Sequence, residues 1–156
     1  MPSKPETRIQ ELHLTLPNPP KPVAKYKTAV LLGNTLYVSG HGPLKPDGAM
    51  ITGRVGADLT LEQGKAAARV VGLAILATVR NTLGSLDKVR RLVKTLGLVN
   101  CTAEFKDQPL VINGFSELMG EVFGDDAGVG ARSAVGTNAL PSNIPVEVEC
   151  IFEVTG

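Results

Sequence analysis

Tryptophan is absent from this chain of 156 residues, and aromatic side chains make up only 4% of it. Proteins that bind single-stranded nucleic acid commonly stack bases on aromatic rings, and this composition offers little material for such a platform. Charges of the two signs nearly cancel, because the formal net charge is +1 at pH 7. A balanced charge provides no broad positive surface for nucleic acid or for an anionic membrane. The composition therefore argues against nucleic acid and membrane as partners.

Long apolar runs and cysteine-rich motifs are also missing. No apolar run approaches the length of a membrane span, and the first residues are polar, so we expect a cytoplasmic protein. The two cysteines, Cys101 and Cys150, do not form a CxxC motif, which argues against a zinc site. Buried, reduced thiols are the expected state, and a Cys101–Cys150 disulfide is the alternative.

What remains is an ordinary globular composition, with 43% hydrophobic and 20% charged residues. The length predicts one domain with a proper core. Residues 1–21 are expected to form an arm, with a short helix over 6–14 and a proline-rich linker that packs on the domain or on a neighbour. Residues 22–156 form the predicted single α+β domain.

The predicted strands and helices follow from periodicity and from turn residues. Tyr26 to Leu32 and residues 35–40 are expected to form a hairpin, and 51–58 to hold a short strand. Residues 90–101 are expected to form a strand with a possible bulge at Gly97. Helices are predicted over 61–83, with Asp58 or Thr60 as cap and Gly84 as stop, and over 109–123. Residues 124–130 are predicted to be a flexible acidic loop. Two helices would then cover one face of a four- to six-stranded mixed sheet.

The C-terminal stretch GARSAVGTNALPSNIPVEVECIF, residues 130–152, carries the candidate chemistry. Alternation places Glu147 and Glu149 on one face of a strand and the apolar side chains on the other, namely Val146, Val148, Cys150 and Phe152. If this strand pairs with the run around Arg132 as an antiparallel hairpin, Arg132 and Glu147 could share one pocket. An arginine fork suits a substrate carboxylate, and a glutamate can deprotonate a water molecule. The alternative is a plain cross-strand ion pair.

Two separated motifs resemble the Rid (YjgF-like) family of reactive-intermediate imine deaminases. One is Gly-x-x-x-Arg-Ser followed by Leu-Pro and Val-Glu-Val-Glu, and the other is GNTLYVSGHGP, residues 33–43. The resemblance runs from about Pro22 to the end of the chain. It implies a chorismate-mutase-like fold, with homotrimers whose sheets form a central β-barrel and whose clefts lie between subunits. It also implies hydrolysis of 2-imino or enamine acids to 2-oxo acids and ammonia, with no cofactor and no metal.

The resemblance assigns roles to individual residues. Arg132 would anchor the substrate carboxylate, and Glu147 would position the attacking water. The remaining matches are implied to line the substrate cleft: Tyr26, Ser39, Gly40, Asn113 and Ala134. Structural alternatives are a packing role for Tyr26, a purely local role for Ser39 and an exposed position for Asn113.

The chain departs from the family pattern at three points. His41 stands where many members have glutamine, Ala134 where a cysteine is frequent, and Gly130 where a proline is common. His41 is either a pH-sensitive pocket residue or a solvated loop histidine. These departures keep open a non-catalytic carboxylate-binding regulator as an alternative function. An endoribonuclease or translation inhibitor is a further alternative, which the neutral charge disfavours.

Overall fold

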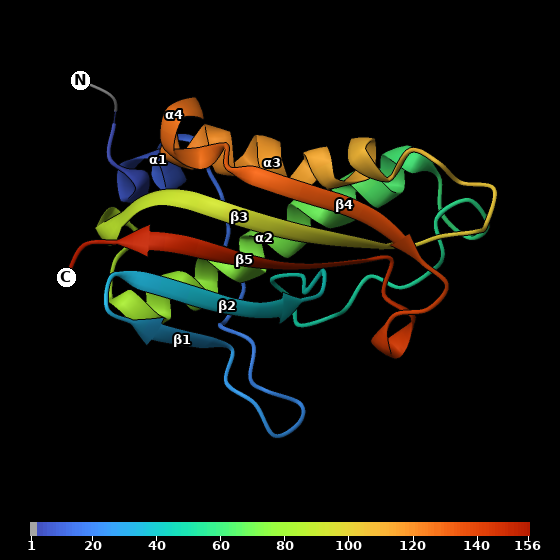
Figure 1. Cartoon of the computed structure of the whole chain (residues 1–156), viewed down its shortest axis with the longest axis horizontal. Helices are drawn as coiled ribbons and strands as arrows, with labels where there is room; N and C mark the ends of the chain where they lie inside the picture. The colour runs from blue at the N-terminus through green and yellow to red at the C-terminus, as the bar shows by residue number, and fades with distance from the viewer. Residues whose placement is uncertain (1–2) are drawn as a thin grey trace.

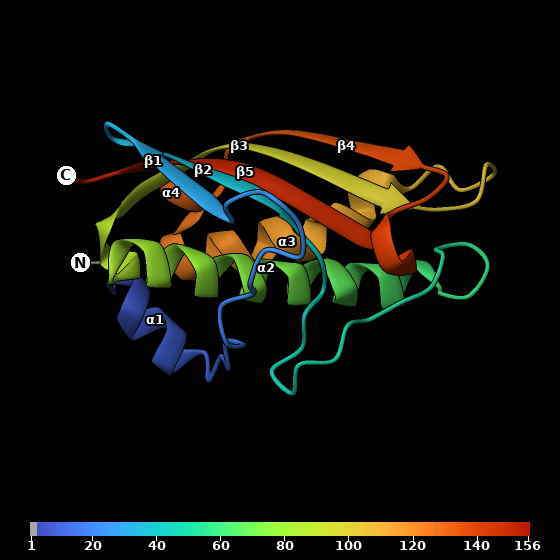
Figure 2. The ribbon, with the colours of Figure 1, turned by 90° about the horizontal axis from the view of Figure 1, so that it is seen from below.

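A computed structural model describes residues 3–156 as a five-stranded sheet with its helices on one side. Figure 1 shows the sheet, and Figure 2 shows it as one layer above α2 and α3, with α1 on the outer side of α2. The strands are β1 (Ala29–Leu32), β2 (Thr35–His41), β3 (Val89–Asn100), β4 (Ala131–Thr137) and β5 (Val146–Val154). The helices are α1 (Pro5–Glu11), α2 (Leu61–Leu83), α3 (Gln108–Phe123) and α4 (Asp125–Gly128), with 3₁₀ turns η1 (Leu86–Lys88) and η2 (Pro141–Asn143). The predicted α+β class is confirmed.

The order of strands corrects the predicted hairpin of Arg132 with Glu147. The sheet runs β1-β2-β5-β3-β4, so β3 lies between the strands that carry the two residues. β4 pairs with β3 in parallel, whereas β5 is antiparallel to both β3 and β2. A parallel pair needs a long crossover, and α3 supplies it between β3 and β4. The short link between β4 and β5 therefore does not make a hairpin.

The core lies between the sheet and its two long helices. On β5 the alternation is as predicted, because Val146, Val148, Cys150, Phe152 and Val154 are buried and Glu149 is exposed. Cys101 and Cys150 are both free and buried, which makes the disulfide alternative wrong. Cys150 pairs with Thr95 in the middle of the sheet, whereas Cys101 lies just beyond the end of β3.

Helix α2 begins and ends at the predicted residues. The Thr60 hydroxyl accepts a hydrogen bond from the Gln63 N–H, and the Gln63 side chain accepts one from the Thr60 N–H, so the two form a capping box. Gly84 ends the helix in the left-handed conformation, with φ 82°. By length and composition α2 could span a membrane, but 61% of its most apolar window is buried inside the structure. It is the core helix of the domain.

Several local predictions are wrong for identifiable reasons. The first strand starts at Ala29, because Tyr26 lies in a tight turn in which its N–H bonds to Ala24 O. The segment 51–58 forms only isolated bridges at Val55. The acidic segment contains the short helix α4, whose first turn carries Asp125, where a negative charge suits the helix dipole.

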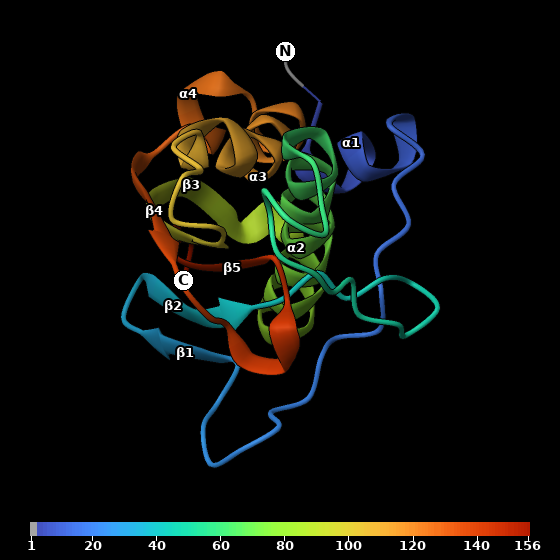
Figure 3. The ribbon, with the colours of Figure 1, turned by 90° about the vertical axis from the view of Figure 1, so that its right-hand side faces the viewer.

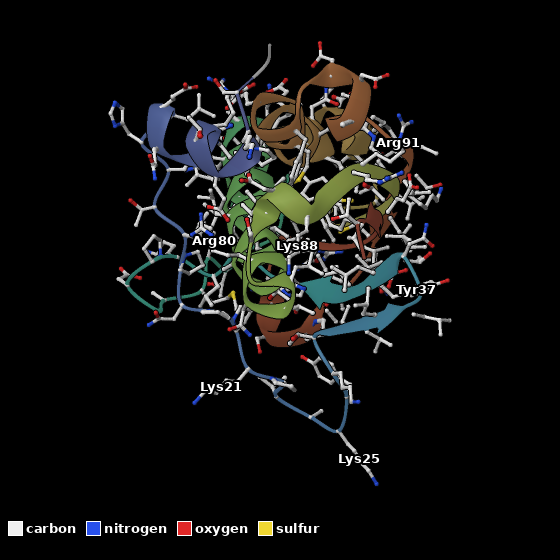
Figure 4. The ribbon with its side chains drawn as sticks, turned by 90° about the vertical axis from the view of Figure 1, so that its left-hand side faces the viewer. Lys21, Lys25, Tyr37, Arg80, Lys88 and Arg91 are labelled. Atoms are coloured by element: carbon white, nitrogen blue, oxygen red, sulfur yellow. The ribbon has the colours of Figure 1, made fainter. Side chains whose placement is uncertain are left out.

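The N-terminal arm packs on the domain of its own chain. The Glu6 carboxylate accepts hydrogen bonds from Arg80 Nε at 3.1 Å and Nη2 at 2.6 Å, and from the Leu86 N–H at 2.8 Å. These contacts tie α1 to the end of α2, where Figure 4 shows Arg80 beside the arm. The segment after α1 then runs along the outside of α2 to the β1 edge of the sheet (Figure 3). The arm thus positions the linker before β1.

Glycines let α3 approach both of its neighbours closely. A Cβ on Gly97 of β3 would lie 2.6 Å from Ile112 Cδ1, so this glycine makes room for a helix side chain. The predicted bulge at Gly97 is wrong, because the register shifts between β3 and β5 lie at Val89/Arg91 and Leu92/Lys94. On α3 itself, a Cβ on Gly114 would collide with the backbone carbonyl of Lys65 in α2. The spacing of the two helices is therefore set by backbone contact.

Two alanine substitutions in α3 should consequently have opposite effects. Gly114→Ala should lower the free energy of unfolding by about 1–3 kcal/mol or more, because a backbone oxygen cannot move aside as a side chain can. Gly120→Ala should be neutral or stabilising by up to about 1 kcal/mol, since alanine favours a helix and only the exposed Asp125 side chain must shift. Urea unfolding of both variants measures the difference. Equal effects would contradict the close helix contact.

Candidate functional site

A cavity beside Glu147 is built from three segments that are far apart in the sequence. The linker contributes Val23 and Tyr26, the end of β2 contributes Gly40 and His41, and the start of β5 contributes Glu147. The rest of the lining is mostly apolar: Pro20, Lys21, Thr28, Gly42, Leu44, Met50, Pro141, Ser142 and Ile144. Figure 4 shows Lys21 and Lys25 on this linker, both pointing away from the ribbon. Glu147 is thus the one carboxylate in a largely apolar cavity.

Burial changes the chemistry of Glu147. It raises the pKa of this carboxyl group above its ordinary value, and the negative charge of Glu149 on the same face of β5 raises it further. Gly40 lies directly against it, since a Cβ at that position would be 2.9 Å from Glu147 Cδ. Any side chain at position 40 would therefore displace the carboxylate. The resemblance pairs Gly40 with Glu147 in one cleft, and the structure brings them together.

His41 is buried, so its interpretation as a solvated loop residue is wrong. It ends β2 at a register shift against β5 and is only 4% exposed. Its Nδ1 lies 2.6 Å from Ser39 O, and its Nε2 lies 2.7 Å from Thr78 Oγ1 on α2. A carbonyl only accepts, so Nδ1 donates, and the neutral ring accepts at Nε2 from the Thr78 hydroxyl. Burial lowers the pKa of His41 below its ordinary value, which favours this neutral ring.

Arg132 belongs to a second cluster, on the edge strand β4. Its Nη1 donates to Asn113 Oδ1 at 2.8 Å and to Ser116 Oγ at 3.2 Å, and its Nη2 donates to Pro109 O at 3.3 Å. Within residues 3–156 its guanidinium forms no ion pair with a carboxylate. Asn113 is therefore not a free surface residue, and Arg132 is held by neutral acceptors that leave its charge uncompensated.

Sequence reasoning missed Ser116 in this cluster. It lies three residues after Asn113 on α3, and residues at that spacing share a helix face. The same spacing, applied to the sequence, could have found it. Ala134 follows Arg132 on the same face of β4 and packs against the core. Position 134 is thus filled by a small apolar contact rather than a thiol.

The two clusters do not meet within one chain. Arg132 pairs with Thr95 and Glu147 pairs with Leu98 on opposite sides of β3. Arg132 contacts α3, whereas Glu147 alternates with the residues that face the helices and so lies on the other face. The shared pocket and the cross-strand ion pair are both wrong for a single chain. We call the two clusters the Glu147 half-site and the Arg132 half-site.

Ser39 lies near the Glu147 half-site but faces elsewhere. Its hydroxyl donates to Lys27 O at 2.6 Å, which ties β2 to the segment before β1. It also lines a shallow hollow on the face of the sheet that no helix covers. Tyr37 in this hollow is 46% exposed, and Figure 4 shows it on the side away from α2. This face also carries Val30, Leu96, Glu149, Ile151 and Lys94. It is mixed in polarity, with large apolar side chains left uncovered.

No group of three or more His, Cys, Asp or Glu side chains in residues 3–156 is arranged to hold a metal ion. The two half-sites themselves offer a fixed guanidinium and a half-buried carboxyl group. The first can bind an anion in a bidentate manner, and the second holds its proton to a higher pH than an ordinary glutamate because burial raises its pKa.

Comparison with known proteins places the chain in a family. Residues 6–154 match a family model described as YjgF/chorismate mutase-like, with endoribonuclease as the activity suggested for the family. The match includes most of the arm helix α1. Protein TCP17 of Trypanosoma cruzi is 40% identical over 146 residues, which cover 94% of this chain and 91% of that protein.

Two solved structures have the same fold. A protein of unknown function from Agrobacterium tumefaciens, Atu1372, is 41% identical, with a TM-score of 0.87 over 96% of this chain and 91% of its own. A candidate endoribonuclease from Shewanella oneidensis is 27% identical, with a TM-score of 0.93 over 97% of this chain and 100% of its own. The chorismate-mutase-like α+β fold expected from the two motifs is thus confirmed.

The buried His41 predicts a specific dependence of stability on pH. The folded chain keeps this ring neutral below the ordinary pKa of 6.5, whereas the unfolded chain takes up a proton there. Its contribution to stability is therefore present above pH 6.5 and is lost as the pH falls below it, at up to about 1.4 kcal/mol per pH unit.

His41→Gln should remove this loss, because glutamine can hydrogen-bond but does not titrate. The measurement is urea unfolding between pH 8 and pH 5. His13→Asn is the matched control, since His13 is the other histidine, is exposed and has a positive φ of 52° that asparagine tolerates. A control that flattened the pH dependence as strongly as His41→Gln would refute the assignment.

Proposed function

Because the chain belongs to the YjgF/chorismate mutase-like family, we propose that it hydrolyses reactive 2-imino or enamine acids to 2-oxo acids and ammonia. The substrates would be of the 2-aminoacrylate or 2-iminobutanoate type, formed as leaked intermediates of pyridoxal phosphate enzymes. One observation carries the proposal: Arg132 is oriented by three neutral acceptors and has no carboxylate partner among residues 3–156. Such a cation is prepared for an anion from outside the chain.

Arg132 would bind the carboxylate of the imino acid. A guanidinium forms two parallel hydrogen bonds to a carboxylate, which fixes the orientation of the ligand as well as its charge. Asn113, Ser116 and the Pro109 carbonyl restrain the fork before the ligand arrives, so little side-chain freedom is lost on binding. The imine carbon, one bond from the carboxylate, is then held in a defined place.

Glu147 would activate the water. The carboxylate takes a proton as the water oxygen bonds to the imine carbon, and the C=N double bond becomes the single bond of a carbinolamine. It returns that proton to nitrogen, then takes the hydroxyl proton of the carbinolamine and passes it to nitrogen as well, so that the C–N bond breaks, ammonia leaves and the carbonyl of the 2-oxo acid forms. No net proton or electron remains on the protein. The raised pKa of Glu147 suits this exchange, because a base with a pKa nearer to neutral also serves as the acid.

A second copy of the chain would complete the site. Arg132 lies on the edge strand β4 and Glu147 on the central strand β5, on the other face of the sheet and with β3 between them, so neither can serve a substrate held by the other within a single chain. The uncovered sheet face, with Tyr37 46% and Val30 47% exposed, offers the surface on which copies could pack. We propose a homotrimer in which three sheets form a central barrel and each cleft combines half-sites of two subunits.

Other cleft roles are proposed on the same basis. Tyr26 and Gly40 line the Glu147 half-site, and Ala134 lies on the same face of β4 as Arg132. The two free thiols accord with the cytoplasmic location that we propose. The A. tumefaciens relative has no assigned function and the S. oneidensis relative is described as a candidate endoribonuclease. RNA cleavage is thus the competing activity for the assay below.

The decisive assay measures ammonia and 2-oxo acid release from enzymatically generated 2-iminopropanoate and 2-iminobutanoate. Arg132→Ala should lower kcat/KM by about 30-fold or more, because a charge pair is lost, and Glu147→Gln should lower kcat by about 100-fold or more. Arg90→Ala and Glu153→Gln are matched controls on exposed or partly exposed residues away from both half-sites. If the folded wild-type protein does not accelerate imine hydrolysis but cleaves RNA, endoribonuclease activity replaces imine hydrolysis as the proposed function.

Mixing two inactive variants tests the shared cleft. In a trimer that contains both Arg132→Ala and Glu147→Gln chains, some clefts combine an intact Arg132 from one chain with an intact Glu147 from another. Co-refolding the two variants should therefore restore a substantial part of the wild-type rate. Each variant refolded alone is the control. Mixed trimers without recovered activity would mean that each cleft uses both residues of one chain.

A further inference from the structure

We propose that a hollow at the carboxyl ends of β3 and β4 binds a small oxyanion, a carboxylate or phosphate group, at a site separate from Arg132. We call it the Arg54 hollow, and its principal lining residues are Arg54, Cys101, Thr102, Lys106, Gln108 and Asn138. Its walls come from the loop before α2, the loop between β3 and α3, and the end of β4. The three segments lie together at the right-hand end of Figure 1. Backbone bonds between Val55 and both Asn100 and Thr102 hold the first two together.

Among the residues that the structure describes, two cations and no acidic side chain line the hollow. Arg54 and Lys106 are its charged residues. Neither forms an ion pair with any carboxylate in residues 3–156, although seven ion pairs occur in that part of the chain. The nearby Asp58 carboxylate accepts from the Arg54 backbone N–H at 2.9 Å rather than from the guanidinium. The lining of the hollow therefore carries two positive charges that no ion pair among residues 3–156 compensates.

The guanidinium of Arg54 is partly satisfied and held in place. Its Nη2 donates to the Cys101 carbonyl at 2.9 Å, whereas its Nε is buried and has no hydrogen-bond partner within residues 3–156. A buried N–H without an acceptor costs about 1–3 kcal/mol, more when the group is charged. Most buried polar groups in folded proteins are paired, so an orphaned one calls for a partner that the chain does not supply. An oxyanion would supply it.

A fixed amide, a lysine with free N–H groups and a missing side chain complete the hollow. The Gln108 amide donates to Phe105 O at 2.9 Å and lies 3.6 Å from Cys101 Sγ. Lys106 Nζ donates to Ala103 O at 2.7 Å, which leaves two of its three N–H groups for a ligand. Gly136 keeps the floor open, because a Cβ there would lie 2.8 Å from Gln108 Nε2 and 2.9 Å from Cys101 Sγ.

The Arg54 hollow is distinct from the Arg132 half-site, so the inference does not rest on imine hydrolysis. Gly136 lies four residues along β4 from Arg132, which is about 13 Å at the usual rise of a strand. None of the groups that hold Arg132 by hydrogen bonds, Asn113, Ser116 and the Pro109 carbonyl, lines the hollow. A separate anion, or a second anionic group of a longer ligand, could therefore occupy it.

The test is a titration with inorganic phosphate and, separately, with acetate at constant ionic strength. Binding is monitored by ¹H–¹⁵N NMR, through the signals of the arginine Nε–H groups and of the Gln108 side-chain amide. We expect a saturable shift of the Arg54 Nε–H signal, which the Arg54→Gln variant identifies by its loss. Lys106→Gln should weaken binding by about tenfold, because a hydrogen bond from a charged group is lost. Arg90→Gln removes the same charge at a distant exposed position and should leave the affinity unchanged.

The outcomes separate the possibilities. Saturation with phosphate alone would make the hollow a phosphate site, and saturation with acetate alone would make it a carboxylate site. Unchanged affinity in Lys106→Gln, whose exposed side chain can be replaced without unfolding the chain, would overturn the inference. Loss of the Arg54 shift in Arg132→Ala would overturn it as well, because the anion would then sit on Arg132. No saturable shift with either anion would equally rule it out.

Discussion

The parallel pairing of β3 with β4 is the constraint on which the rest of the structure depends. Because the two strands run in the same direction, the chain must return from the end of β3 to the start of β4. Helix α3 makes this return and therefore lies over β3 and β4. The same helix then supplies Asn113, Ser116 and the Pro109 carbonyl to Arg132. Its first residue, Gln108, and the loop before it, which carries Lys106, line the Arg54 hollow. Glycines at positions 97 and 114 make this placement possible, because they let α3 lie against β3 and α2 without a clash.

Opposite electrostatic conditions distinguish the two half-sites. Arg132 is restrained by neutral acceptors near an edge strand, so its charge remains available to a ligand. Glu147 lies in a largely apolar cavity beside another carboxylate, so its charged form is disfavoured. The proposed reaction needs both properties, a permanent cation for the carboxylate and a carboxyl group that exchanges protons. Their separation within one chain is the physical reason to expect that the functional unit contains more than one copy.

Local patterns predicted the elements well, and long-range pairing was the part that they missed. The 23 residues of α2 match the prediction at both ends, because a capping box and a left-handed glycine are local signals. The faces of β5 follow from alternation alone. The burial of His41 was not predictable in the same way, because it depends on Thr78, 37 residues further along the chain. The orphaned Nε of Arg54 likewise depends on how three separate segments meet.

The amino-acid sequence by itself determined the α+β class, the apolar face of each long element and, through two motifs, the family. These properties depend on residues close together in the chain, where spacing and side-chain chemistry act directly. Only the tertiary structure decided that β3 separates Arg132 from Glu147, that His41 is buried and that the Nε of Arg54 lacks a hydrogen-bond partner among residues 3–156. Strand order is set by which pairing buries the most apolar surface at the least cost in chain entropy, a balance over the whole chain that no local pattern contains.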